Sequence, residues 1–160
     1  MEFIRVEPGD PALVEEVYSI LAAAGAYMVE TFGLTHWEIP YGRECITEDV
    51  ANKQVYLVKS ENAFVATFTL SHQTIHVFED NPDAGAMYLS KFAVHPRIMK
   101  AGVGAACINY MEALCRANHK TKLRFDVYIK SAHAIKFYLK MGYHEVPSPS
   151  PIVLCMEKTL

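Results

Sequence analysis

The spacing of hydrophobic positions in the first third of the chain predicts one strand followed by two helices. Residues 3–6 form a short apolar run typical of a strand, and Asp10 followed by Pro11 is a common start of a helix. Apolar residues then recur at helical spacing, so we expect an amphipathic helix that runs on to Phe32. The residues of this stripe are Leu13, Val17, Ile20, Leu21 and Ala24. A shorter helix is predicted over 44–52.

From position 54 the helical spacing gives way to the composition and two-residue period of strands. Residues 55–58 and 63–70 are rich in β-branched and aromatic side chains, and the polar residues 60–62 between them predict an antiparallel hairpin. A third run, 87–94, is expected to form the next strand and to stop at Pro96. Three strands in succession favour a largely antiparallel sheet.

The second half of the chain alternates between helices and strands. Helices are predicted over 102–118 and 131–141, the second of which ends before Gly142, a common residue after a helix C-terminus. Between them, 123–129 alternates between apolar and polar positions as a strand does. Its polar positions are Arg124, Asp126 and Tyr128. With a last strand over 152–157, the order predicts an α+β fold with a mixed, largely antiparallel sheet, because three consecutive strands precede one β-α-β crossover.

Length and charge bound the class of protein. The chain has 160 residues, 51% of them hydrophobic, which is enough for one compact core, so we expect a single domain over 1–160. The formal net charge is −3 and the sequence has no Lys/Arg cluster that would bind a phosphate backbone, so we expect no nucleic-acid partner. The polar start of the chain indicates neither a signal peptide nor a membrane span, so a cytoplasmic location and no membrane partner are expected.

The cysteines and histidines argue against disulfides and metal sites. Cys45, Cys107, Cys115 and Cys155 form no CxxC pair and lie within apolar segments, which favours reduced thiols in the core. No two histidines recur with a carboxylate at metal-ligand spacing, so no metal is predicted.

The first segment with candidate chemistry runs from the end of the 87–94 strand into the next helix. Gly102 and Gly104 lie at the start of that helix, where unpaired backbone N–H groups and the helix dipole favour an anion such as a phosphate. The missing third glycine argues against a dinucleotide fingerprint, and the segment is not a Walker loop. Taken alone, the two glycines are better explained by close packing of the helix against a strand.

The second segment, 131–143, follows after one intervening strand. It reads Ser-Ala-His-Ala-Ile-Lys-Phe-Tyr-Leu-Lys-Met-Gly-Tyr. Together the two segments resemble the GNAT superfamily of N-acetyltransferases over about 87–143. The first resembles the family's pyrophosphate loop, Arg/Gln-x-x-Gly-x-Gly/Ala, with Met99 in place of Arg or Gln. The second resembles its Asn-x-x-Ala-x-x-Phe-Tyr-x-x-x-Gly-Phe element, with Ser131 in place of Asn, a residue that can also cap a helix.

This resemblance implies a GNAT fold with about six or seven strands and about four helices, and acetyl-CoA as cosubstrate. Phe92, Ala93 and Val94 would run beside the pantetheine arm, with one backbone N–H polarising the thioester carbonyl. The pyrophosphate would be held by Met99, Lys100, Ala101, Gly102, Val103, Gly104 and Ala105. Ser131 and Phe137 would also bind the cosubstrate.

Tyr138 would protonate the departing thiolate. A phenol with a pKa near ~10 is mostly protonated at pH 7 and can donate to a thiolate whose conjugate acid lies near ~8.5. Without the resemblance, the helical spacing of Tyr138 with Ala134 and Ile135 favours a residue that packs in the core.

The acceptor amine must lose a proton before it attacks, and for an amine of pKa ~10.4 the neutral form costs about 4 to 5 kcal/mol at pH 7. Asp126 is the first candidate for the base, because it lies on the polar face of the strand before the Tyr138 helix. A surface aspartate paired with Arg124 is the alternative. The weaker candidates are His72, His76, His95 and His133.

In GNAT proteins the segment between the first two helices usually lines the acceptor site. Here it contains His36, Trp37, Glu38 and Tyr41, and aromatic walls with one acid suit an amine that is cationic before reaction. Alternatively, Trp37 fills the core beneath a loop.

The sequence therefore predicts an enzyme that moves an acetyl group from acetyl-CoA to a primary amine of a small molecule or peptide by direct attack, without a covalent enzyme intermediate. Two alternatives stay open, a CoA-binding module without turnover and an unrelated α+β scaffold. A homodimer also stays open.

Overall fold

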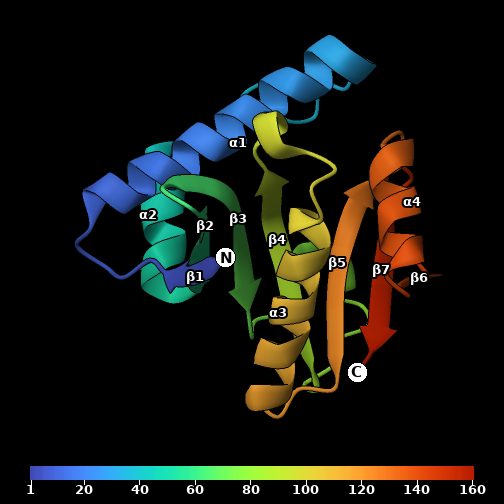
Figure 1. The fold of residues 1–160 in the computed structure, drawn as a ribbon. Coiled ribbons are helices and arrows are strands. Elements are labelled where there is room, and N and C mark those ends of the chain that lie inside the picture. The colour runs from blue at the N-terminus through green and yellow to red at the C-terminus, as the bar shows by residue number, and fades with distance from the viewer. The chain divides into compact units, whose positions relative to one another are not determined.

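The computed structural model describes residues 1–160 as seven strands, four α-helices and two short 3-10 helices (Figure 1). The strands are β1 (Glu2–Arg5), β2 (Gln54–Ser60), β3 (Ala63–Ser71), β4 (Ala86–Val94), β5 (Lys122–Tyr128), β6 (His144–Val146) and β7 (Val153–Thr159). The helices are α1 (Pro11–Phe32), α2 (Arg43–Asn52), η1 (His76–Phe78), η2 (Pro96–Ile98), α3 (Val103–Ala117) and α4 (Ala132–Lys140).

The strands form one sheet in the order β1-β2-β3-β4-β5-β7-β6. β1 pairs antiparallel with β2, and β7 pairs antiparallel with both β5 and β6. β4 and β5 pair in parallel, with Ala86 opposite Lys122 and Tyr88 opposite Arg124, because α3 forms the crossover between them. The predicted α+β class with a mixed, largely antiparallel sheet is confirmed.

The ends of the helices and strands differ from the sequence-based prediction by one or two residues. α1 begins as predicted, because the Asp10 side chain accepts a hydrogen bond from the Leu13 N–H at 3.1 Å and Pro11 follows it. α4 ends before Gly142, which has a φ of 89°. The prediction missed β6, because three residues are too few to show a period and this strand exists through its pairing with β7.

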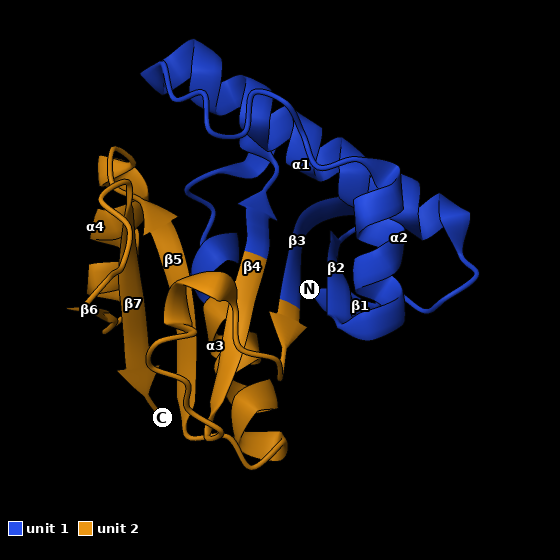
Figure 2. Cartoon of the chain, turned by 180° about the vertical axis from the view of Figure 1, so that it is seen from behind, with its two compact units in different colours: residues 1–69, 91–107 blue, residues 70–90, 108–160 orange.

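The chain divides into two compact units (Figure 2). Unit 1 contains Met1–Thr69 and Lys91–Cys107, and unit 2 contains Leu70–Ser90 and Ile108–Leu160. Since the chain passes between the units several times, neither is a continuous segment. The assignment of 1–160 to a single domain stays a prediction.

Unit 1 is built on the buried stripe of α1, which packs against β2 and α2. The stripe has the predicted helical spacing, and burial of each large aliphatic side chain stabilises the fold by about 1.5–3 kcal/mol. The buried members of this core are Val6, Val14, Val17, Ile20, Leu21, Ala24, Ile46, Val50, Val55, Leu57 and Ala93.

By length and composition alone, α1 is apolar enough to cross a membrane. The core helix of a soluble protein passes the same test, and six residues of α1 are buried inside the protein. The expectation that the protein has no membrane partner stays a prediction.

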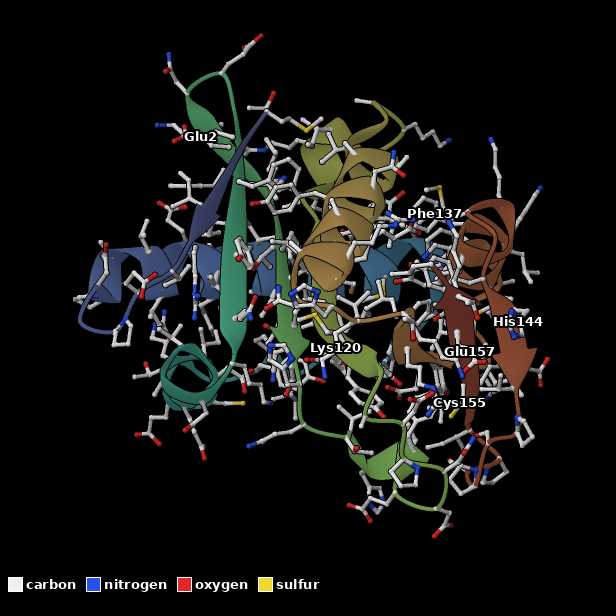
Figure 3. All side chains as sticks on the ribbon, turned by 90° about the horizontal axis from the view of Figure 1, so that it is seen from below. Glu2, Lys120, Phe137, His144, Cys155 and Glu157 are labelled. Atoms are coloured by element: carbon white, nitrogen blue, oxygen red, sulfur yellow. The ribbon has the colours of Figure 1, made fainter.

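Unit 2 contains β5 and β7, which pair along their whole lengths. The buried Arg124 of β5 donates to Glu157 of β7 at 2.8 Å and to the Asn81 carbonyl at 2.7 Å, and its guanidinium lies 5.0 Å from the centre of the Phe78 ring. Figure 3 shows Glu157 and Cys155 on β7 with His144 beside them, and the His144 Nε2 atom lies 3.7 Å from Glu157. Arg124 thus serves to hold the 79–85 loop to the sheet.

All four cysteines are free, as predicted, and Cys107, Cys115 and Cys155 are buried. Cys45 is only half-buried, so the expectation of a core thiol holds for three of the four. Burial raises the pKa of the Cys107 thiol to about 12, so this thiol is protonated at neutral pH and unreactive.

Candidate active site

The predicted pyrophosphate loop runs from η2 to the first turn of α3. Lys100 and Gly102 both have left-handed backbone conformations, with φ values of 69° and 80°. A Cβ atom on Gly102 would meet no atom within 4 Å, so the backbone conformation and not a lack of space requires glycine there. Because the first N–H groups of a helix have no intrahelical partner, the start of α3 suits an anion.

The seven residues of this loop divide into an exposed and an anchored part. Met99, Lys100, Ala101 and Gly102 are exposed, whereas Val103 is buried. Gly104 and Ala105 in the first turn of α3 are half-buried. The loop therefore presents backbone and one lysine to solvent while α3 fixes its end.

His95 anchors the other end of the loop. Its backbone N–H donates to the Val65 carbonyl at 2.8 Å, and its Nδ1 atom accepts a hydrogen bond from the Arg97 N–H at 3.2 Å. Burial, followed by the charge of Arg97, lowers the pKa of the His95 imidazole. Since Nδ1 caps η2, a structural role explains this histidine without a role as base.

Tyr138 lies in an aromatic cluster of unit 2. Its ring centre is 4.3 Å from that of Phe125 on β5, 5.2 Å from that of Phe137 and 6.2 Å from that of Tyr143. Burial raises the pKa of the Tyr138 phenol, and the charge of Asp126 raises it further. This phenol is therefore protonated throughout the physiological range, and it is also packed, so both sequence interpretations of Tyr138 describe part of its environment.

Asp126 neighbours Phe125 on β5, so strand alternation directs its side chain to the opposite face of the sheet from the Tyr138 cluster. Asp126 is exposed by surface area, and partial loss of water raises the pKa of its carboxyl. The alternative pair with Arg124 does not form, because the ion pairs of Arg124 are made with Glu157 and Asp83. Asp126 is thus an unpaired carboxylate whose charge acts on Tyr138.

Ser131 and Phe137 flank this region on α4. Ser131 precedes the helix and is 3% exposed, but its side chain does not cap the helix, contrary to the expectation from its residue type. Its backbone has a φ of −81° and a ψ of 66°. Phe137 is half-buried and packs edge-on against Tyr138.

The predicted pantetheine strand is the second half of β4. Ala93 is buried in the unit 1 core, whereas Phe92 and Val94 are half-buried. Lys91, directly before them, has a φ of 49°, which interrupts the regular strand geometry.

The predicted acceptor segment brings its aromatic side chains together. The ring of Trp37 lies 6.0 Å from that of His36 and 6.0 Å, edge-on, from that of Tyr41. Trp37 also packs against the unit 1 core and is only half-buried, so it both covers the core and contributes to the aromatic group.

Sequence reasoning missed three residues that hold this segment. Gly25 of α1 faces the Trp37 backbone, Lys91 lies 4.6 Å from the centre of the Tyr41 ring, and the buried Asp49 of α2 pairs with Lys91. A lysine inside an apolar strand and a glycine inside a helical stripe are the sequence signals that could have found two of them.

The other candidate bases lie at the surface, and partial burial lowers the pKa of the His133 imidazole. His72, His76 and His133 are exposed, and His76 lies 3.4 Å from Glu79. No group of three potential metal ligands lies together in the structure, and the expectation of metal-free chemistry stays a prediction.

Comparison with known proteins gives the same family that the two motifs indicate. Residues 14–143 match the model of the acetyltransferase (GNAT) family. No curated protein sequence matches the chain.

Among solved structures, the PaiA N-acetyltransferase from Thermoplasma acidophilum in complex with coenzyme A is similar, with a TM-score of 0.77 and 12% identity over 100% of both chains. The ribosomal-protein-S18-alanine N-acetyltransferase from Escherichia coli has a TM-score of 0.72 and 15% identity over 99% of this chain and 92% of its own. An aminoglycoside 6′-N-acetyltransferase complexed with coenzyme A has a TM-score of 0.70 and 16% identity over 99% and 97%.

At these identities the structures establish the fold, and the family model, which spans most of the chain, establishes the relationship. The interpretation as an unrelated α+β scaffold is therefore wrong. The chain belongs to the GNAT family of acetyltransferases.

Proposed function

We propose that this enzyme transfers the acetyl group of acetyl-CoA directly to a primary amine of a small molecule or peptide, with Tyr138 as general acid and Asp126 as general base. The observation that carries this proposal is the match of residues 14–143 to the acetyltransferase (GNAT) family, together with the placement of Asp126 on β5 and Tyr138 on α4, the element that follows it. Pairs of titratable groups with perturbed pKa values are typical of catalytic sites.

The acid and the base lie toward opposite faces of one strand, which suits direct transfer. The amine nitrogen would attack the thioester carbonyl carbon from the Asp126 side, and the C–S bond would break toward the Tyr138 side. A cationic amine loses two protons on the way to the amide: the first passes to the Asp126 carboxylate before attack, and the second leaves the nitrogen for solvent after attack. The phenol proton of Tyr138 passes to the departing sulfur. Asp126 then releases its proton to solvent and Tyr138 takes one up, which restores the enzyme.

The charge of Asp126 couples the two proton transfers. That negative charge is the second cause of the raised pKa of Tyr138, after burial. When Asp126 accepts the amine proton its charge disappears, so the pKa of Tyr138 falls and the phenol becomes a stronger acid. Burial, the larger cause, keeps the pKa of Tyr138 above its ordinary value throughout.

Acetyl-CoA is proposed to bind to the 99–105 loop and to residues 92–94 of β4. The exposed backbone around Gly102 and the start of α3 fit a pyrophosphate, and Lys100 adds a positive charge that Met99 does not supply. The relatives from Thermoplasma acidophilum and the aminoglycoside enzyme were each crystallised with coenzyme A, which supports the same ligand here. We assign no metal to the reaction.

The acceptor is proposed to meet the aromatic group of His36, Trp37 and Tyr41. An amine is cationic before reaction, and aromatic faces attract cations. Structurally similar enzymes are named for a ribosomal-protein alanine and for an aminoglycoside, which are respectively a peptide amine and a small-molecule amine. A cytoplasmic location fits such acceptors.

The test is a panel of amines incubated with acetyl-CoA and the enzyme, with release of free thiol as the measurement. The panel contains an alanine-initiated peptide, an aminoglycoside and a linear polyamine, and acetyl-CoA without amine gives the hydrolysis background. We expect at least one acceptor to exceed this background and to gain one acetyl group by mass. Thermal stabilisation by acetyl-CoA without thiol release from a broad panel would support the binding module instead.

A further inference from the structure

The aromatic segment between α1 and α2 is fastened at two points within unit 1. At the first, the Trp37 backbone packs against α1 so closely that a Cβ atom on Gly25 would lie 2.2 Å from the Trp37 carbonyl oxygen. At the second, the Lys91 ammonium lies 4.6 Å from the centre of the Tyr41 ring. A loop held at both ends of its aromatic run has a defined geometry.

Lys91 is unusual in both its backbone and its side chain. Its φ of 49° is a left-handed conformation, which is uncommon for a residue other than glycine and persists where surrounding contacts hold it. Its side chain is only 10% exposed, although lysine is among the residues least often buried. Conformation and burial are both explained if the ammonium is required where it lies.

Asp49 holds the Lys91 ammonium in place. The Asp49 side chain is 7% exposed and pairs through Oδ2 with Lys91 and through Oδ1 with Lys53 at 2.8 Å. Lys53 directly follows α2 as its C-cap residue and is 28% exposed, so its pair stays at the end of that helix. The pair with Lys91 instead joins α2 to β4.

We propose that Lys91, held by Asp49, is a positioning residue that fixes the Trp37–Tyr41 loop against β4 and thereby sets the affinity for the acceptor amine. The inference rests on the proposed function for the identity of the loop as acceptor site. One side chain then links that loop to the strand whose next residues, Phe92 to Val94, are proposed to run beside the thioester. The ammonium also occupies a position over the Tyr41 ring, so Trp37 is left as the main aromatic surface for the cationic acceptor.

Fluorescence tests the loop geometry without any acceptor, because Trp37 is the only tryptophan of the chain. In Lys91→Met the loop should loosen, and quenching of Trp37 emission by acrylamide should rise about twofold, since a cation–π contact and a buried ion pair are lost. Lys53→Met is the matched control, because it removes a lysine from the same carboxylate without touching Tyr41, and its quenching should equal that of the parent.

Two further variants keep the test decisive if Lys91→Met does not fold. Lys91→Arg preserves the charge, so acrylamide should quench its Trp37 emission nearly as it does in the parent. Tyr41→Leu keeps the Lys91–Asp49 pair but removes the ring, and it should raise quenching as Lys91→Met does. Parental quenching in a folded Lys91→Met or Tyr41→Leu protein would overturn the proposal.

Steady-state kinetics test the second part with whichever amine of the panel releases most thiol. In Lys91→Met the KM for that amine should rise about tenfold, while the KM for acetyl-CoA changes less than about twofold. Lys53→Met should alter neither constant. An equal rise in both constants would overturn the positioning role, whereas absence of turnover in the parent would refute the proposed function and leave the fluorescence result standing.

Discussion

The α2–β4 region and the β5–α4 region each contain an aspartate near a tyrosine, but the two aspartates have opposite settings. Asp49 is buried and bound by two lysines, one of which lies over Tyr41. Asp126 is exposed, makes no ion pair, and acts on Tyr138 only through its charge. A carboxylate neutralised by lysines is a structural anchor, whereas an unpaired carboxylate with a raised pKa is available to take a proton.

The largest expected effect comes from Tyr138→Phe, which removes the proton and keeps the ring. Turnover should fall by roughly 10² to 10⁴ if the hydroxyl protonates the leaving thiolate, whereas stability should change by about 1 kcal/mol or less. Thiol release and thermal unfolding measure the two quantities.

Tyr143→Phe is the matched control for Tyr138→Phe. The Tyr143 ring lies 5.0 Å from the same Phe125, and its hydroxyl donates to the buried Glu112 at 3.1 Å. The loss of that hydrogen bond should cost about 1 kcal/mol of stability without changing turnover. Equal turnover in both variants would make Tyr138 a packing residue like Tyr143.

Asp126→Asn tests the other half of the same pair. Turnover at neutral pH should fall by roughly 10 to 10³, because water can replace a base in part, while the affinity for acetyl-CoA stays nearly unchanged. In the parent, turnover should decline as the pH falls through the raised pKa of Asp126, and so at a higher pH than for an ordinary aspartate. If Asp126→Asn turns over at pH 7 as fast as the parent, Asp126 is not the base, and water or a histidine takes the proton.

The stability effect of Asp126→Asn should have the opposite sign to its effect on turnover. Because the folded-state pKa of Asp126 is raised, folding favours its protonated form, and the charged form destabilises the fold at every pH above that pKa. Asparagine removes this cost, so the variant should be as stable as the parent at pH 7 or slightly more stable. Thermal unfolding at pH 7 and at pH 4 would show whether the difference shrinks in acid, as linkage requires.

Asp49→Asn should affect stability instead. The substitution leaves the buried Lys91 ammonium without its carboxylate, so the free energy of unfolding should fall by about 3–5 kcal/mol. Denaturant unfolding of Asp49→Asn beside Asp126→Asn tests the comparison directly. Similar stability in both variants would contradict the distinction between anchor and base.

The β5–α4 region could be read from the sequence because its information is local. The alternation along β5 placed Asp126 opposite Phe125, and the motif around Tyr138 identified the helix that follows. The alternative pair of Asp126 with Arg124 does not form, because Arg124 reaches Glu157 on β7 and Asp83 in a distant loop. Cross-strand partners such as these depend on sheet order, which the spacing of a single strand does not contain.

The α2–β4 region could be predicted only in outline. The aromatic segment was identified from its composition, but the contacts that hold it join residues far apart in sequence, as in the pair of Asp49 with Lys91. The left-handed conformation of Lys91 likewise has no signal in its residue type. Residue propensities and hydrophobic periodicity do not predict tertiary contacts such as these. The contact of Gly25 with the Trp37 backbone is an example inside a helix.

Gly25 offers the smallest of the expected effects. Glycine inside a helix costs about 1 kcal/mol relative to alanine, so Gly25→Ala would stabilise an isolated α1. In the protein, however, the new Cβ would lie 2.2 Å from the Trp37 carbonyl oxygen, and neither the helix nor that backbone can yield cheaply. Overpacking of this kind costs about 1–3 kcal/mol, so the net change should be a loss of about 1 kcal/mol with displacement of the loop. Gly42→Ala is the control, because a Cβ there meets no atom within 4 Å and its φ of −68° suits any residue. Gly25→Ala should change both the thermal unfolding and the acrylamide quenching of Trp37, whereas Gly42→Ala should change neither. A more stable Gly25→Ala protein with parental quenching would show that the loop is not fastened at Trp37.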